Sequence, residues 1–292
     1  MINLLLLLTV VFWGMSFIAT KAALGYLTPV EIIALRLLVG TPALYLVILF
    51  KKIDIQWRRS DVIILLLASI ILAAHFLIQA VGLEYTSATN TAWLVATIPI
   101  FIAVFSRIFL KERMTALKTG GIALAAIGVV LLVSKGEIYS LGWLKSVGDW
   151  IILSSAVTWS VYTIITRDLS RRYHPLSATL LILIMPTLVL NGYAAYTTPV
   201  SKLLSLPVSI MLALVFLGVF CLGLAHWFWL EGLSRKGATE VGVYIFIEPL
   251  VTTVAAIPIL DERLTLFTVI GAVLIIGGVY MVQKKISRKL NK

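Results

Sequence analysis

The sequence predicts an all-α integral membrane protein, with ten transmembrane helices arranged as two inverted five-helix repeats around a central cavity. Three observations lead to this fold: little charge, apolar stretches of bilayer-crossing length, and similarity between the two halves of the chain. Of the 292 residues, 61% are hydrophobic and 13% are charged. Soluble domains have about 45–50% apolar and about 25% charged residues. A soluble protein's surface cannot be covered with so little charge.

Ten apolar stretches lie between glycines, prolines and clusters of charge. Each is close to, or longer than, the length of about 20 residues that a helix needs to cross the hydrocarbon layer. In the first half they cover residues 2–24, 30–50, 62–83, 88–110 and 117–133. In the second half they cover residues 149–168, 176–196, 208–233, 238–260 and 266–283. The N-terminus lacks the basic region of a cleaved signal peptide, so we expect the first helix to be retained.

The two halves of the chain are related by an internal repeat. Residues 76–131 align without gaps with residues 226–281 at an offset of 150, which matches Pro99 to Pro249. In the same way, Trp13 matches Trp159 at an offset of 146. We therefore expect one repeat at 2–133, a second at 149–283 and a basic tail at 284–292. Five is odd, so the second repeat is inverted, which is a recurrent architecture of secondary transporters with a midplane binding site.

The distribution of Lys and Arg predicts the orientation. The loops on the N-terminal side hold 18 of the 24 basic residues, those on the other side hold five, and Arg36 lies within the second span. Positively charged short loops stay in the cytoplasm, so we expect a multi-pass plasma-membrane protein with both termini cytoplasmic. Because this charge is dispersed over short loops, the net charge of +11 does not indicate a nucleic-acid partner.

Four features occur in a specific order and spacing: Phe12-Trp13-Gly14, Arg36, Pro99 with the segment 110–115 (LKERMT), and Glu248-Pro249 with the segment 260–265 (LDERLT). Together they resemble the EamA type of the drug/metabolite transporter superfamily. The resemblance implies a cavity lined mainly by the third, fourth, eighth and ninth helices, with parts of the first and sixth. It also implies that the fifth and tenth helices act as bracing elements. Members carry amino acids, drugs, nucleotide sugars, phosphorylated sugars or choline-like solutes, so the resemblance leaves the cargo open.

Glu248 is the first candidate for a substrate or coupling site. It lies ten residues into the predicted helix 238–260, roughly 15 Å into a core about 30 Å thick. Ionisable groups at this depth are costly unless they are paired, neutralised or facing water. The carboxyl group can alternate between binding a proton and binding a cationic group. The alternative is that it stays protonated and donates one interhelical hydrogen bond. Pro249 adds a kink and a freed carbonyl one turn earlier.

Further candidates follow from helical spacing. His75 and Gln79 share a helix face because they are four residues apart, and Tyr244 shares a face with Glu248 for the same reason. His75 is either an interhelical hydrogen-bonding residue or a proton relay, and we expect His226 to anchor its helix at the interface. An aromatic wall, or ordinary packing, is expected from Trp13, Trp159, Trp93, Tyr162 and Tyr244, with Asn90 as a lesser polar candidate.

Other residues are assigned structural or gating roles. Arg36 lies five positions from Glu31, so the two do not pair within the helix, and Arg36 either braces the fold or attracts an anionic group. The ion pairs expected at the helix ends, which fix termini or act as gates, involve Glu112, Arg113, Glu262 and Arg263. Pro99 and Pro249 are the expected kink positions. Glycine faces in the fifth and tenth helices permit close approach, within the protomer or in a homodimer.

These features predict a secondary-active or facilitative transporter or exporter of a small metabolite or drug. An amino-acid-like or an amphipathic, cationic solute is favoured, and a coupling proton is possible. No phosphate-binding loop is present, and three histidines with one cysteine supply neither a nucleophile with its base nor a metal set. We therefore expect no enzyme activity, cofactor or metal. The alternative is a flippase for a lipid-linked substrate, or a non-transporting membrane partner with the same fold.

Overall fold

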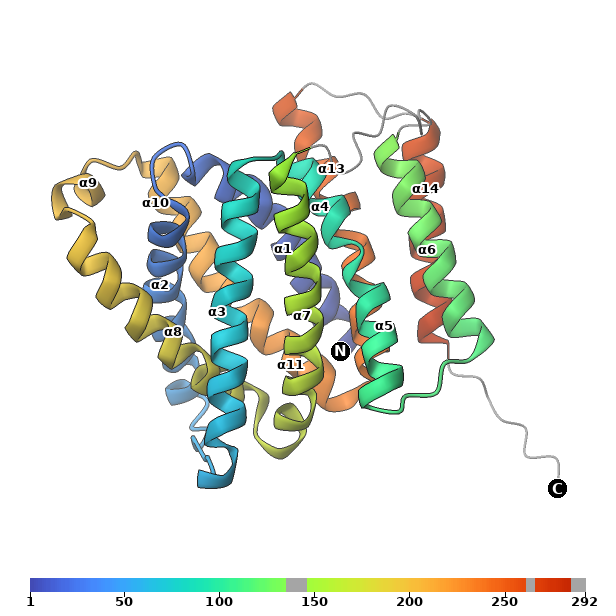
Figure 1. The fold of residues 1–292 in the computed structure, drawn as a ribbon, viewed down its shortest axis with the longest axis horizontal. Helices are drawn as coiled ribbons and strands as arrows, with labels where there is room; N and C mark the ends of the chain where they lie inside the picture. The colour runs from blue at the N-terminus through green and yellow to red at the C-terminus, as the bar shows by residue number, and fades with distance from the viewer. Residues whose placement is uncertain (135–145, 261–265, 285–292) are drawn as a thin grey trace.

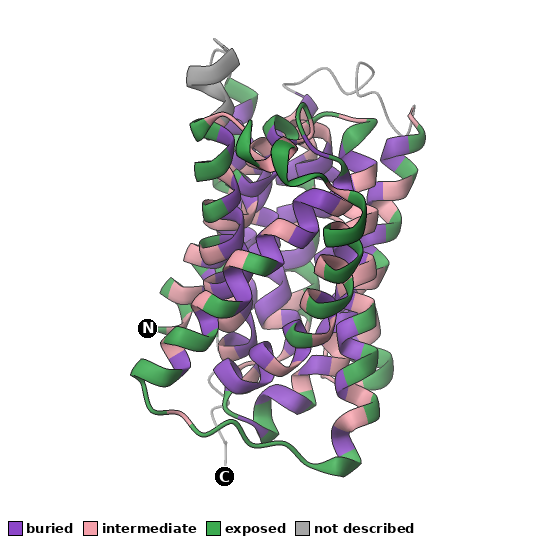
Figure 2. Ribbon diagram, turned by 90° about the vertical axis from the view of Figure 1, so that its left-hand side faces the viewer, coloured by how far each residue is buried: buried purple, intermediate pink, exposed green. Residues whose placement is uncertain are grey.

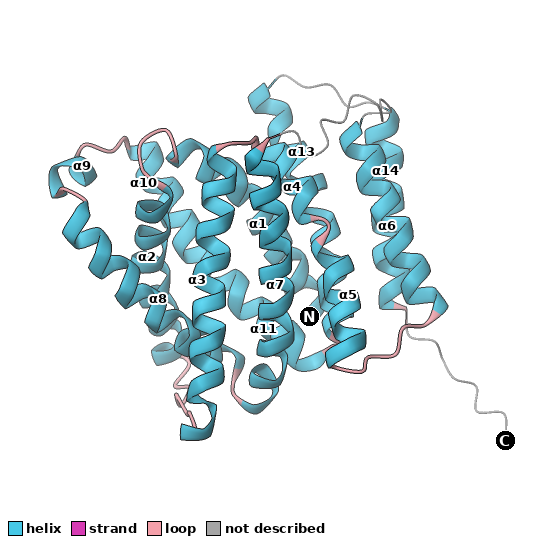
Figure 3. Cartoon of the chain, viewed as in Figure 1, coloured by secondary structure: helices cyan, strands magenta, loops and turns pink. Residues whose placement is uncertain are grey.

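The computed structural model describes residues 1–134, 146–260 and 266–284, and every long regular element in those ranges is a helix (Figures 1 and 3). Glu262, Arg263 and residues 285–292 of the predicted tail lie outside the described residues. Helices are the expected elements because lipid offers no hydrogen-bond partner for a free backbone amide. Nine helical stretches in the described ranges are long and apolar enough to cross a membrane.

The first half contains six main helices. They are α1 (Ile2–Ala23), α2 (Pro29–Phe50), α3 (Val62–Glu84), α4 (Ala88–Val95), α5 (Ile98–Phe109) and α6 (Ala116–Ser134), with a short 3₁₀ turn η1 (Arg59–Asp61) before α3. A capping box starts α2, in which Thr28 accepts from the Glu31 amide and Glu31 accepts from the Thr28 amide. The stretch predicted as one helix over 88–110 is broken between α4 and α5.

The second half repeats this plan with more irregular helices. It contains α7 (Val147–Arg172), α8 (Pro175–Thr197), a short α9 (Val200–Leu204) and α14 (Leu266–Gln283). The stretch 208–235 combines α10 (Val208–Val215), the π-helix η3 (Phe216–Leu224) and α11 (Ala225–Arg235). The stretch 238–260 combines α12 (Ala238–Gly242), the 3₁₀ helix η4 (Val243–Ile247) and α13 (Glu248–Leu260). Each of these two stretches was predicted as a single regular helix.

The sixth predicted span, 149–168, corresponds to α7, which is the most polar of the ten spans and is not among the nine apolar stretches. It packs on α3, α5 and α11, while Trp150 and Val157 are exposed on its outer face. Several of its hydroxyls donate to carbonyls one turn earlier, as Ser160 does to Ala156 (2.7 Å) and Thr166 to Tyr162 (2.7 Å). The backbone of α7 therefore satisfies much of this polarity, while the Tyr162 and Thr163 hydroxyls have no partner among the described residues.

The two halves are inverted and interleaved (Figure 1). α1 starts toward the lower end of the bundle in this view, whereas α7 starts at the upper end. α1 packs against α11 and α13 of the second half, and α7 packs against α3 and α5 of the first half. The buried residues therefore form a core shared by both halves, and the exposed residues lie on the outside of the bundle (Figure 2). Many of the exposed side chains are large and apolar, as expected for a surface that faces lipid.

Glycines set the closest helix contacts. Gly121 and Gly128 of α6 face Gly278 and Gly271 of α14, where an added Cβ would lie 2.4–2.7 Å from the opposing glycine carbonyl oxygens. Small residues let helix backbones approach this closely in a membrane. The glycine faces predicted for close packing are thus used between α6 and α14 of the same chain.

Candidate functional site

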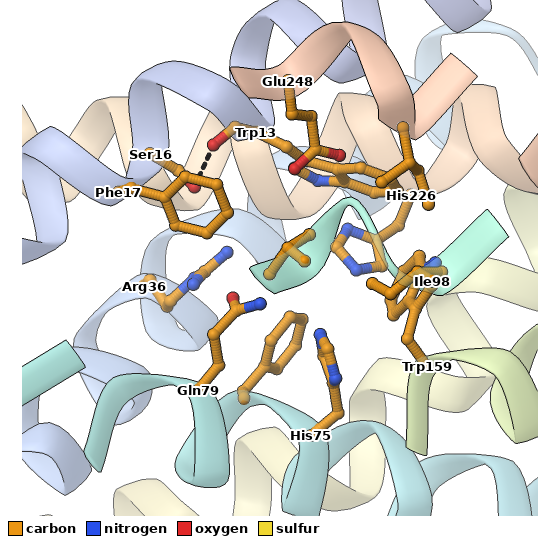
Figure 4. Close-up of a pocket in the computed structure, with 13 residues that line it drawn as sticks. Trp13, Ser16, Phe17, Arg36, His75, Gln79, Ile98, Trp159, His226 and Glu248 are labelled. Carbon is orange, nitrogen blue, oxygen red and sulfur yellow. Dashed lines mark hydrogen bonds between the residues drawn. The ribbon is translucent and has the colours of Figure 1, made fainter. Parts of the chain in front are cut away.

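A cavity lies between the two halves, at the level where the helices of both halves are interrupted (Figure 4). Its free volume is about 30 Å³, enough for about one or two water molecules, so a solute can enter only if the halves move apart. The lining residues are Trp13, Ser16, Phe17, Arg36, His75, Phe76, Gln79, Val95, Ile98, Trp159, His226, Ile245 and Glu248.

The lining is built from repeat-related positions. Four pairs of lining residues occupy matching places in the two halves: Trp13 and Trp159, Phe76 and His226, Val95 and Ile245, and Ile98 and Glu248. Two of these pairs match an apolar residue of the first half with a polar or charged residue of the second. Repeat-related residues therefore form much of the cavity wall. Within these pairs, the polar or charged residues occur at positions where the two repeats differ, which are His226 and Glu248.

Two residues that line the cavity, Ile98 and Glu248, lie at the helix breaks. Pro99 stands in the first turn of α5 and Pro249 in the first turn of α13, where the missing amide removes no helical hydrogen bond. The Glu248 amide donates to the carbonyl of Ile245. The free carbonyl that we expected one turn before Pro249 is thus occupied, and the polar group that the break presents to the cavity is the Glu248 side chain.

Two opposite charges line the cavity without meeting. Glu248 is 2% exposed and Arg36 is 5% exposed. Among the described residues, neither has an ion-pair partner within 4 Å, and the Arg36 Nε donates to no acceptor. The Arg36 guanidinium lies 4.6 Å from the centroid of the Phe76 ring. Figure 4 shows both side chains directed at the same space from different helices.

Two histidines face the cavity with fixed ring orientations. The His75 Nδ1 lies 3.1 Å from the Ser155 carbonyl oxygen, and the His226 Nδ1 lies 3.1 Å from the Cys221 carbonyl oxygen. A carbonyl oxygen only accepts, so Nδ1 carries the proton in both rings and Nε2 is an acceptor in the neutral form. The interfacial position that we predicted for His226 is wrong, because this side chain is 1% exposed and lines the cavity.

Aromatic rings form one wall of the cavity. The Trp13 and Trp159 rings meet edge to face at 4.9 Å, and the Trp13 Nε1 donates to the Cys221 carbonyl oxygen (3.0 Å) within the π-helix η3. The same oxygen holds His226, so the irregular η3 orients two lining side chains. The Trp159 Nε1 has no partner among the described residues. Tyr162 packs behind Trp159 at 5.0 Å and does not line the cavity.

Besides Tyr162, three predicted site residues lie outside the cavity. Asn90 donates to Asp149 and accepts from the Trp93 indole, so Asn90 and Trp93 belong to a hydrogen-bond network at the start of α7 and α4. Tyr244 is buried in η4, with the Lys236 ammonium 5.9 Å from its ring centroid. The 3₁₀ geometry of η4 rotates Tyr244 away from the face of Glu248, because residues four apart coincide only in an α-helix.

Glu112, which lies between α5 and α6, connects the two halves. Its carboxylate accepts from the amides of Ala238 (2.7 Å) and Thr239 (3.3 Å), and it lies 3.6 Å from the Arg167 Nε. Arg113 is exposed. The contact that fixes a helix end is therefore made by Glu112 with the start of α12 and with α7, and not with its neighbour in sequence.

Replacing Glu112 with Gln should lower the free energy of unfolding by about 1–2 kcal/mol, because hydrogen bonds to a charged group are about twice as strong as neutral ones. Thermal unfolding of the purified protein in detergent measures this change. The exposed Glu84, changed to Gln, is the matched control and should unfold as the wild type does. Equal unfolding temperatures for the two variants would show that the Glu112 contact contributes nothing to stability.

Sequence reasoning missed seven lining residues: Ser16, Phe17, Phe76, Val95, Ile98, His226 and Ile245. For most of them a signal was available in the repeat. Ile98, Val95 and Phe76 each lie 150 positions before another lining residue, so extending the alignment from Glu248 outward would have found the symmetric wall. Ser16 and Phe17 follow from their position one turn after Trp13.

Comparison with known proteins gives whole-length matches. The profile of the EamA-like transporter family matches residues 1–134 and 146–283. An uncharacterized transporter of Archaeoglobus fulgidus is 29% identical over 288 residues, covering 97% of each chain. The uncharacterized transporter YcxC of Bacillus subtilis is 32% identical over 274 residues, covering 91% of this chain and 87% of that protein.

Two further matches concern function and fold. A protein of Escherichia coli named as a probable amino-acid metabolite efflux pump is 28% identical over 297 residues, covering 96% of this chain and 93% of that protein. A crystal structure with 20% identity superposes with a TM-score of 0.76 over 97% of this chain and 98% of that chain. At this identity the structural match shows a shared fold.

Proposed function

This chain belongs to the EamA-like transporter family and is a membrane transporter, and from that premise we propose its cargo and mode of action. It carries a small amino-acid-like solute, one with a cationic group, across the plasma membrane by alternating access, as a secondary-active or facilitative exporter. The observation that carries this proposal is the buried Glu248 carboxylate, which faces the cavity between the inverted halves and has no ion-pair partner among the described residues.

A cationic group suits the surroundings of Glu248. The carboxylate offers an ion pair, and the electron-rich faces of Trp13 and Trp159 attract cations. Removed from water, such a pair is worth more than at the surface, which offsets the cost of stripping the solute of its hydration. The E. coli relative named as a probable amino-acid metabolite efflux pump supports export of this class of solute.

Alternating access is supported by the small cavity and the broken helices. A cavity of about 30 Å³ holds no amino acid, so the site must open. The breaks between α4 and α5 and across η4 lie at matching places in the two halves, where each broken helix can bend. The connections from α2 to α3, α5 to α6, α7 to α8 and α11 to α12 lie at the lower end of Figure 1. These connections and the helix ends beside them carry most of the described basic residues, so we assign this end to the cytoplasm.

Reconstitution of the purified protein in liposomes tests this function. We expect saturable movement of labelled amino acids or organic cations, at rates well above those of protein-free vesicles, with and without an imposed pH gradient. A fluorescent lipid in the same vesicles tests the flippase alternative. Movement of the lipid without movement of any soluble solute would overturn the proposal in favour of that alternative.

A further inference from the structure

Arg36 is a buried cation that has no counter-ion among the residues that the structure describes. The side chain is 5% exposed, and its Nε has no hydrogen-bond partner among the described residues. A guanidinium keeps its charge in proteins, so the arrangement is costly unless a negative group joins it. The ring of Phe76 beneath it, at 4.6 Å, stabilises the cation without neutralising it.

The nearest acidic residue on the same helix is committed elsewhere. Glu31 accepts from Lys202 (2.7 and 2.9 Å), from Thr198 (3.0 Å) and from the Thr28 amide (2.7 Å). The bracing role considered for Arg36 requires an acceptor for its guanidinium on a neighbouring helix, and the described residues supply none. The position of Arg36 is instead fixed by its backbone, because the Arg36 carbonyl oxygen packs against Gly218 of the π-helix η3.

The guanidinium points at the transport cavity. Arg36 lines the cavity with Gln79 on one side, and Glu248 enters the same space from another helix (Figure 4). The two charges are more than 4 Å apart in the described structure, since no ion pair joins them. A solute that bears both a negative and a positive group can satisfy both residues at once, whereas a simple cation leaves Arg36 unpaired.

We propose that Arg36 is the carboxylate-binding residue of the transport site, so that the solute is a zwitterion held between Arg36 and Glu248. A carboxylate matches the planar fork of a guanidinium with two parallel hydrogen bonds. The amide of Gln79 is placed to donate a further hydrogen bond to the same anionic group. This inference rests on the proposed transport function and adds the second charge that the solute must carry.

The test compares solutes that share a side chain and differ in the carboxylate. The probes are L-phenylalanine, phenethylamine and L-phenylalaninamide, with the corresponding leucine and threonine series run in parallel. Binding is measured by thermal stabilisation of the full-length protein in detergent, and transport by counterflow in liposomes. The wild type should bind the amino acid at least about tenfold more tightly than the amine or the amide, because the last two leave a buried charge unpaired.

The variants locate this preference on Arg36. Arg36→Gln should lose at least about tenfold in affinity for the amino acid and keep its affinity for the amine within about twofold. Arg36→Lys should recover part of the loss, because it restores the charge without the fork. The exposed Arg59, changed to Gln, removes the same charge outside the cavity and should behave as the wild type does.

Three results would overturn the inference. If the wild type binds the amino acid, the amine and the amide equally, the carboxylate takes no part in recognition, and cation transport remains intact. This result does not depend on whether any variant folds. Equal losses for all three probes in Arg36→Gln, with a lowered unfolding temperature, would make Arg36 a brace. Neither binding nor transport in any series by the wild type would refute the proposed function itself, and this inference with it.

Discussion

Replacing Glu248 with Gln is expected to slow transport of the cationic or zwitterionic solute by about 30-fold or more, because the variant removes the only carboxylate that lines the described cavity. Gln has nearly the same shape and keeps the packing against Trp13, yet it can neither attract an ammonium group nor take up a proton. If Glu248 also couples transport to protons, the variant loses its response to a pH gradient. Initial rates in liposomes at two pH values measure both effects.

The matched control is Asp168→Asn, which removes a carboxylate whose side chain is 58% exposed at the end of α7. It should transport at the wild-type rate. A normal rate with normal pH dependence in Glu248→Gln would support the other interpretation of this residue. In that case the side chain remains protonated throughout the cycle and serves as a hydrogen-bond donor between helices.

The second large effect is expected from Gly40→Ala in α2. An added Cβ at this position would lie 2.2 Å from the Gly218 carbonyl oxygen and 2.9 Å from its carbonyl carbon, which are backbone atoms that cannot rotate away. α2 and η3 must then separate, and we expect the free energy of unfolding to fall by about 2–3 kcal/mol. Thermal unfolding and gel filtration in detergent measure the loss.

Gly192→Ala in α8 is the control for this experiment, because no atom lies within 4 Å of the Cβ that it adds. It should be neutral or stabilise the protein by about 0.5–1 kcal/mol, since Ala favours a helix more than Gly does. Unfolding of both variants at the wild-type temperature would show that α2 and η3 are free to move apart. Gly40 is one turn from Arg36, so loss of this contact should also impair transport.

The ten predicted spans agree with the structure to within a few residues at most ends, because lipid forces an apolar chain to satisfy its backbone as helix. Hydropathy does not report how a helix is interrupted. The predicted helices 88–110 and 238–260 contain a break and a 3₁₀ segment, and the predicted helix 208–233 contains the π-helix η3. All three interruptions lie where helices of the two halves meet around the cavity. These irregular segments therefore coincide with packing between the halves.

Prediction of the site was partial for a related reason. Glu248, His75, Gln79, Trp13 and Trp159 meet at one cavity, whereas Tyr162, Tyr244, Asn90 and Trp93 do not line it. Arg36, for which the sequence left open a bracing role and an anion-attracting role, lines the cavity. Tyr244 was misplaced because its spacing from Glu248 was counted along an α-helix, while η4 winds three residues per turn.

The sequence by itself determined that this chain crosses the membrane as two repeated halves, and that an acidic residue, Glu248, lies deep in the ninth stretch. Only the tertiary structure decided that Arg36 and His226 share a cavity with Glu248 and that the two charges stay apart. The physical reason is that membrane helices are apolar on most faces, so periodicity does not say which face points inward. That rotation is set by close contacts between the halves, such as Gly40 on Gly218 and Trp13 on Cys221.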